Sequence, residues 1–225
     1  MAARVAAAAV LFCWMAGAQG DPPPPNLAPL KVGVMVWFEQ PPQKDFLQQL
    51  RREVEEIFRP SGLDLTWELR DGKRQPGAYD RVVLLDFRGK CGSNRLDITH
   101  AASAAQPRLG GTMVHNGEVI PFAMVDCENM AAVVRSMHTQ VAGKLLLPGI
   151  YNRLAGRVAA HELMHVLLRT TDHRSTDCMR PFLRATDLQF AARLTPAEIA
   201  ALRLAGRASP SPTLAQGTHR GILDP

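Results

Sequence analysis

The sequence predicts an α+β domain built around a mixed, twisted β-sheet of four to five strands. Short apolar runs alternate with longer segments whose apolar residues recur every three or four positions, as strands and amphipathic helices do. One segment, residues 151–168, has helical character and is apolar on nearly every side, which predicts a buried helix. Of the 225 residues, 46% are hydrophobic and 21% are charged, which is the composition of a globular protein.

The first half of the predicted domain begins with a strand at Lys31–Phe38. Apolar residues at helical spacing then predict a helix over 46–58, which Pro60-Ser61-Gly62 ends. Strict alternation from Leu63 to Leu69 predicts a strand with one apolar face, and the continuous apolar run Arg81–Phe87 predicts a strand buried on both faces. This order of strand, helix and strand implies a parallel crossover.

The second half of the domain supplies a hairpin and three helices. Two short strands around the Asn116-Gly117 turn, within Gly110–Val125, are expected at the edge of the sheet. Helical spacing recurs over 130–141 and, after Pro148-Gly149, over 151–168. A last helix begins at Thr195-Pro196-Ala197-Glu198, which has the pattern of a capping box.

Residues 1–20 have the features of a signal peptide. Arg4 precedes an apolar run that is too short to span a bilayer, and Ala18 and Gly20 are the small residues that a signal peptidase reads. An uncleaved anchor is the alternative. We therefore expect export to the periplasm or the medium, without stable membrane insertion after cleavage, and we expect a monomer.

The remaining boundaries follow from composition and charge. Five prolines make residues 21–29 a spacer, the domain occupies 30–206, and residues 207–225 form a flexible tail. Cleavage at residue 20 would remove one base and no acid, which lowers the net charge from +5 to +4. Because these charges form no basic block, nucleic-acid binding is not expected.

Three cysteines remain after the predicted cleavage: Cys91, Cys127 and Cys178. An odd number in an oxidising compartment indicates one disulfide and one free thiol. We prefer Cys91 paired with Cys127, because each comes just after a predicted strand, although Cys178 could replace either. No paired C-x-x-C spacing exists, which excludes a zinc site of the finger type.

The motif HELMH lies inside the apolar helix. Because residues four apart share one helical face, His161 and His165 can reach a single metal ion, and Glu162 is placed to take a proton from metal-bound water. Two satisfied core histidines are the bland alternative. Burying two imidazoles and a carboxylate without a partner is costly, however, and Zn²⁺ would be that partner.

A catalytic zinc site needs a third protein ligand and an open position for water. His173 follows a polar stretch that can end the helix and return the chain to the metal, and we favour it. Glu198 is the second candidate, although its place in the capping box explains it without a metal. Asp172 and Asp177 are further oxygen donors if His173 points away.

The stretch HELMHVLLRTTDHRSTDCMRP resembles the active site of metzincin-type zinc metallopeptidases, and most closely that of small exported bacterial members. The resemblance extends over about residues 30–203 and implies a zincin-like fold with a buried active-site helix. It also implies that Met179 forms the Met-turn, an apolar floor beneath the histidines. The usual metzincin signature has glycine and histidine where this chain has Leu168 and Thr171. We expect the chain reversal to spread over 169–172 instead, which makes that glycine unnecessary.

These residues together predict a zinc-dependent endopeptidase that hydrolyses peptide or protein substrates. Zinc-activated water would be the nucleophile and Glu162 the general base. The alternative from another class is a non-catalytic exported binding module with a structural or vestigial zinc site. A closed site with four protein ligands would favour that module, and an open site facing Glu162 would favour the enzyme.

Overall fold

The computed structural model describes residues 29–70, 78–92, 108–140, 147–173, 178–180 and 187–205. The predicted signal peptide, nearly all of the proline-rich spacer and the predicted tail lie outside these residues. No helix within the described ranges is long and apolar enough to cross a membrane.

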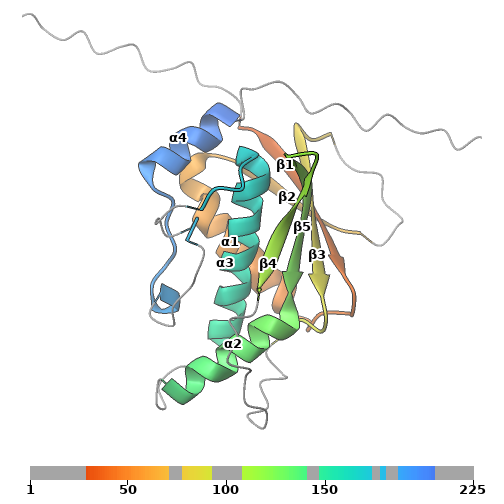
Figure 1. The fold of residues 1–225 in the computed structure, drawn as a ribbon, viewed down its shortest axis with the longest axis vertical. Coiled ribbons are helices and arrows are strands. Elements are labelled where there is room, and N and C mark those ends of the chain that lie inside the picture. The colour runs from red at the N-terminus through yellow and green to blue at the C-terminus, as the bar shows by residue number, and fades with distance from the viewer. Residues whose placement is uncertain are drawn as a thin grey trace, which may run out of the picture.

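A five-stranded sheet forms one layer of the molecule, in the spatial order β2-β1-β3-β5-β4 (Figure 1). Neighbouring strands are parallel except β4 and β5, which are antiparallel, so the mixed sheet is confirmed. The strands are β1 (Lys31–Phe38), β2 (Asp64–Leu69), β3 (Arg81–Arg88), β4 (Gly110–His115) and β5 (Glu118–Asp126).

The hairpin of β4 and β5 differs from expectation in one respect. Only β4 lies at the edge of the sheet, whereas β5 lies inside it and pairs in parallel with β3, with Phe87 opposite Val125. Ala123 and Val125 are fully buried, and β5 packs against helix α3. The turn at Asn116-Gly117 shows that the two strands are neighbours, but it cannot show which of them pairs with the rest of the sheet.

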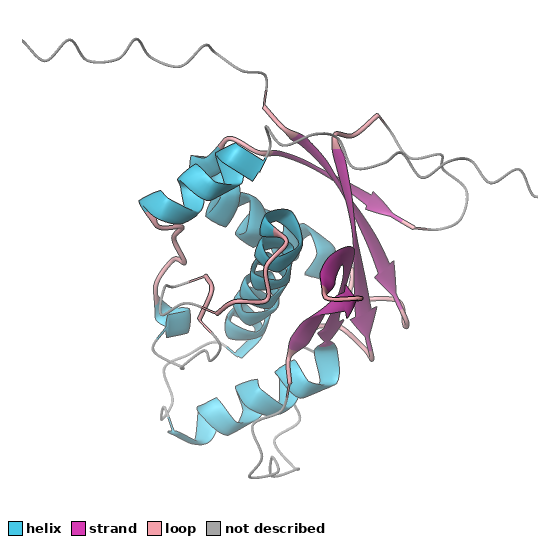
Figure 2. Ribbon diagram, turned by 45° about the horizontal axis from the view of Figure 1, so that its top comes forward, coloured by secondary structure: helices cyan, strands magenta, loops and turns pink. Residues whose placement is uncertain are grey.

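Four helices lie on one side of the sheet (Figures 1 and 2). They are α1 (Phe46–Phe58), α2 (Cys127–Gln140), α3 (Leu147–Leu168) and α4 (Pro196–Ala205), with short 3₁₀ turns at Arg59–Ser61 and Asp187–Gln189. Helix α1 has the bounds that the sequence predicts. Helix α3 begins four residues earlier than the 151 predicted, because proline is tolerated in the first turn of a helix, where its missing N–H is not needed.

Helix α3 lies between α1 and the sheet and contacts β3, β4 and β5. Small residues allow this close packing: Ala155, Ala159 and Ala160 are fully buried. A Cβ at Gly156 would clash with the side chain of Glu53 on α1, so the two helices cross closely there. The helix that carries the HELMH motif is therefore held on two sides.

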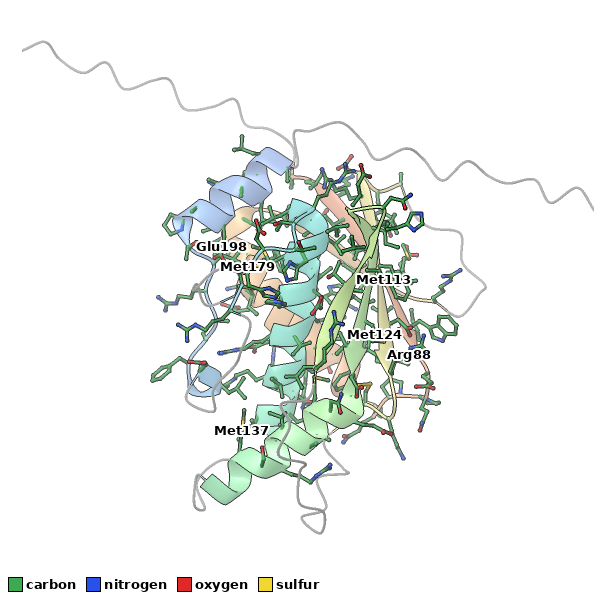
Figure 3. The ribbon with its side chains drawn as sticks, in the orientation of Figure 1. Arg88, Met113, Met124, Met137, Met179 and Glu198 are labelled. Carbon is green, nitrogen blue, oxygen red and sulfur yellow. A yellow bond between two sulfur atoms is a disulfide. The ribbon has the colours of Figure 1, made fainter. Side chains whose placement is uncertain are left out.

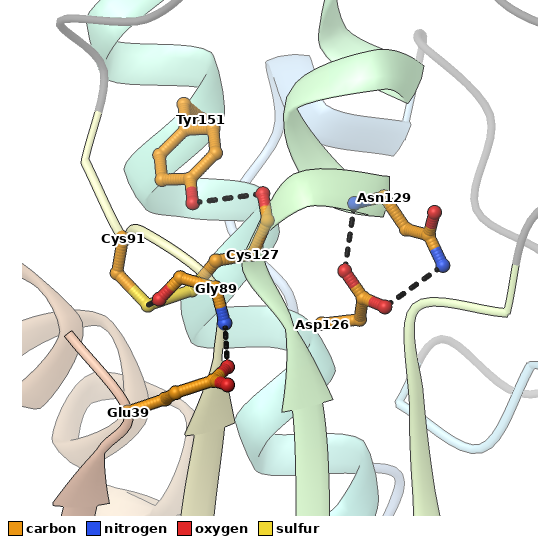
Figure 4. The surroundings of a disulfide bond; sticks show 7 residues. All are labelled: Glu39, Gly89, Cys91, Asp126, Cys127, Asn129 and Tyr151. Atoms are coloured by element: carbon orange, nitrogen blue, oxygen red, sulfur yellow. Dashed lines mark hydrogen bonds between the residues drawn. A yellow bond between two sulfur atoms is a disulfide. The ribbon is translucent and has the colours of Figure 1, made fainter.

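A disulfide joins Cys91, just after β3, to Cys127, the first residue of α2 (Figure 4). This is the pairing that we preferred from the sequence, and Cys178 is buried with a free thiol. The hydroxyl of Tyr151 on α3 donates to the carbonyl of Cys127 at 3.2 Å. Burial raises the pKa of Tyr151 to about 12, so the phenol stays a donor at any physiological pH.

Opening the disulfide is expected to destabilise the protein by about 2–4 kcal/mol, since the bridge closes a loop with a sequence separation of 36 residues. The measurement is urea unfolding with and without a reductant. A Cys91→Ala/Cys127→Ala variant provides the control, because reductant should leave its unfolding midpoint unchanged. An unshifted midpoint for the reduced wild-type chain contradicts the prediction.

Candidate metal centre

The last two turns of α3 carry the HELMH residues. His161 is partly buried, whereas Glu162 and His165 are 5% and 4% exposed. Because the spacing of four residues nearly matches the helical repeat, the two imidazole rings lie one above the other, with centroids 4.5 Å apart. The fully buried Leu163 and Met164 on the other side of the same turn hold the helix in the core.

A sharp turn at Arg169 ends α3. Its φ is +50°, its N–H donates to the carbonyl of Val166 at 3.3 Å, and the N–H of Thr170 donates to the carbonyl of His165 at 3.1 Å. This is the Schellman arrangement, in which the left-handed residue is usually glycine. The expectation that the reversal spreads over 169–172 is therefore wrong: the left-handed conformation is confined to one residue, and arginine adopts it.

This turn brings His173 back to the helix. Its Nε2 atom lies 3.2 Å from Nε2 of His161, which in turn lies 3.0 Å from Nε2 of His165. The three residues form a group whose ligand atoms all lie within 4.8 Å of one another. Zn–N bonds of about 2.0–2.1 Å at a tetrahedral angle give nitrogen separations of roughly 3.3 Å, so the spacing fits a zinc ion.

Backbone carbonyls determine which nitrogen of each helical imidazole is free. Nδ1 of His161 lies 2.7 Å from the carbonyl of Cys178, and Nδ1 of His165 lies 2.7 Å from that of Thr170. A carbonyl only accepts, so each Nδ1 carries the proton and, in a neutral ring, each Nε2 carries a lone pair. Two lone pairs facing each other at 3.0 Å repel, and a cation between them removes that repulsion.

Both helical rings are held in the neutral form. Burial lowers the pKa of His161 and His165 below the usual 6.5, and the carbonyl contacts of the rings oppose this only in part. A metal ligand must be an unprotonated nitrogen, so the same burial that fixes the rings also keeps them able to bind a cation.

Glu162 faces the edge strand β4. The hydroxyl of Thr112 donates to its Oε2 atom at 2.7 Å. A Cβ at Gly110 would lie 2.8 Å from Oε1, so glycine leaves the room that the carboxylate occupies. Burial raises the pKa of Glu162, and the Thr112 hydrogen bond acts in the opposite direction. A cation held by the neighbouring histidines would also lower that pKa.

The other proposed ligands are not in the metal-binding group. Glu198 forms the predicted capping box, because its Oε2 accepts from the N–H of Thr195 at 2.7 Å and its own N–H donates to Thr195 Oγ1 at 3.2 Å. Asp172 is exposed and, among the described residues, the group contains histidines alone. Asp177 lies outside the described residues.

Met179 lies in a turn with Cys178 and is 2% exposed. Figure 3 shows Met179 and Glu198 on the side of α3 that faces α4. The carbonyl of Cys178 is the acceptor for His161, so this turn contacts the histidine group through its backbone. Whether the side chain of Met179 forms a Met-turn floor stays a prediction.

The remaining histidines are not part of the group. His115 is exposed at the end of β4, and His138 lies in α2, whereas His100 and His219 lie outside the described residues. Sequence reasoning missed Thr112 and the two carbonyls that bind the Nδ1 atoms. Only the separation in sequence hides Thr112, which is 50 residues from Glu162.

Comparisons with known proteins give one likeness. No protein-family model matches the chain, and no curated protein matches it. Among solved structures, the chain is similar to archaemetzincin from Methanopyrus kandleri, with 12% identity over 81% of this chain and 98% of that chain, and a TM-score of 0.45. The function proposed below rests on the geometry of the histidine group and of Glu162.

Replacing His173 by alanine is expected to weaken zinc binding by more than the roughly 10–100-fold that losing an outer-shell contact costs, because a direct ligand is lost. The measurement is competitive titration with a chromogenic chelator. His115→Ala is the matched control and should retain the affinity of the wild-type chain. Equal affinity in the two variants would show that His173 is not a ligand.

The buried histidines predict a pH-dependent stability of the metal-free chain. The unfolded state binds protons near pH 6.5, and the folded state binds them only at lower pH, so stability falls as the pH drops below about 6.5. The slope is at most about 1.4 kcal/mol per pH unit for each histidine.

The test of this pH dependence uses the Glu162→Gln background, because the raised pKa of Glu162 contributes with the opposite sign. Urea unfolding of the chelator-treated protein is measured between about pH 7.5 and 5.5. Adding His161→Ala should reduce the slope. An unchanged slope would show that His161 does not titrate differently in the folded and unfolded states.

Proposed function

We propose that this chain is an exported zinc metallopeptidase that hydrolyses peptide bonds. The single observation that carries the proposal is the convergence of three imidazole Nε2 atoms beside the buried carboxylate of Glu162. His161, His165 and His173 would hold Zn²⁺, and Glu162 would be the general base. The signal-peptide features of residues 1–20 support export.

The number of donors favours a catalytic site over a structural one. Structural zinc sites are closed by four protein ligands, whereas catalytic sites have three and leave a position for water. Among the described residues, three donors form the group, and the acidic residue next to them is still a glutamate. A binding module braced by zinc would have no use for a buried carboxylate at that position.

Bound zinc would lower the pKa of a water molecule to about 7 and would polarise the scissile carbonyl. Glu162 would accept the proton of the attacking water and deliver it to the leaving amine. The carbonyls of Cys178 and Thr170 hold two imidazole rings in the tautomer that binds metal, so the chain itself supplies the orientation of the ligands.

An extended peptide fits the exposed edge of β4 as an additional strand. Within the described sheet, β4 pairs only with β5, and its residues Met113 and Val114 are 49% and 47% exposed (Figure 3). The same strand contributes Thr112 to the site, so a peptide bound along β4 would pass close to Glu162. We propose peptides or proteins as substrates for this reason.

Glu162→Gln is expected to retain zinc and to lower hydrolysis by at least about 10²-fold, because the amide cannot accept the proton. Zinc content is measured by elemental analysis, and hydrolysis by digestion of a quenched-fluorescent peptide library. A chelator should abolish the wild-type activity, and added zinc should restore it. Undiminished turnover in the glutamine variant would exclude Glu162 as the base.

A further inference from the structure

The carboxylate of Glu162 is held by the edge strand and not by its own helix. Thr112 Oγ1 lies 2.7 Å from Glu162 Oε2 and 3.3 Å from the backbone carbonyl of the same residue. A hydroxyl donates one proton, and the shorter contact is to the carboxylate, which is the stronger acceptor. The hydrogen bond joins strand β4 to helix α3 across 50 residues of sequence.

The two oxygens of Glu162 have different surroundings. Oε2 accepts from Thr112, and no donor among the described residues reaches Oε1. Gly110 lies two residues before Thr112 on the same face of β4, and a Cβ there would meet Oε1 at 2.8 Å and Val158 Cγ1 at 2.9 Å. Position 110 therefore provides space for the carboxylate, and position 112 provides the hydrogen bond that orients it.

We infer that Thr112 is a positioning residue for Glu162: it binds Oε2 and leaves Oε1 as the oxygen that accepts the proton from water. The inference rests on the proposed function. A base must be held within hydrogen-bonding reach of the proton that it takes, and a displacement of 1 Å can cost about 100-fold in rate. In a carboxylate that is 5% exposed, one fixed donor decides the orientation.

The kinetic test compares Thr112→Val with Thr112→Ser on the best-cleaved peptide of the quenched-fluorescent library. Valine keeps the shape and loses the donor, so kcat should fall roughly 10–100-fold with little change in KM, and serine should restore most of kcat. Thr66→Val, at an exposed position of β2 on the opposite edge of the sheet, is the matched control and should change neither parameter.

A second measurement does not depend on activity. In the chelator-treated protein, Thr112→Val should lower the urea midpoint in the wild-type background, because it removes the donor from a buried carboxylate. It should lower the midpoint much less in a Glu162→Ala background. Equal shifts in the two backgrounds would show that the two side chains are not coupled, and would overturn the inference.

The outcomes separate this inference from the proposed function. If the wild-type chain hydrolyses peptides and Thr112→Val retains its kcat, the inference is wrong and the proposed function stands. If serine fails to restore kcat, the hydroxyl is not the group that matters, and the inference is also wrong. A wild-type chain that binds zinc and cleaves no peptide of the library overturns both.

Discussion

Two hydrogen bonds from imidazole to backbone determine the chemistry of this protein. The Nδ1 atoms of His161 and His165 are both committed to carbonyls, which leaves both Nε2 lone pairs directed at one point. The carbonyls belong to residues 170 and 178, in the two turns that follow α3. The path of the chain after the helix therefore sets the tautomer of the ligands, and the tautomer makes the group a cation site.

The rest of the fold supports this arrangement by keeping α3 in place. Small residues let the helix lie close to α1 and the sheet, and Arg81 of β3 donates to the carbonyl of Leu167 near its C-terminal end. Strand β4 adds the hydroxyl of Thr112, which acts on Glu162. Each group of the site is thus fixed by an element other than the one that carries it, so the site depends on the packing of the whole domain.

Patterns in the sequence predicted the elements whose causes are local. Helix α1 ends where Pro60-Ser61-Gly62 predicts, and the capping box of Thr195 and Glu198 forms as predicted. The place of β5 inside the sheet was not predictable in this way, because its partner β3 is distant in sequence. The left-handed Arg169 was also missed, since arginine carries no signal for that conformation.

For the candidate site, the local sequence was sufficient to put His161 and His165 on one face, because a four-residue spacing in a helix has only one outcome. It also indicated His173 as the third donor but left Glu198 and Asp172 open. Tertiary structure was needed to bring His173 to the pair and to place Thr112 against Glu162. Those contacts depend on where distant segments meet, and no spacing along the chain encodes the packing that brings them together.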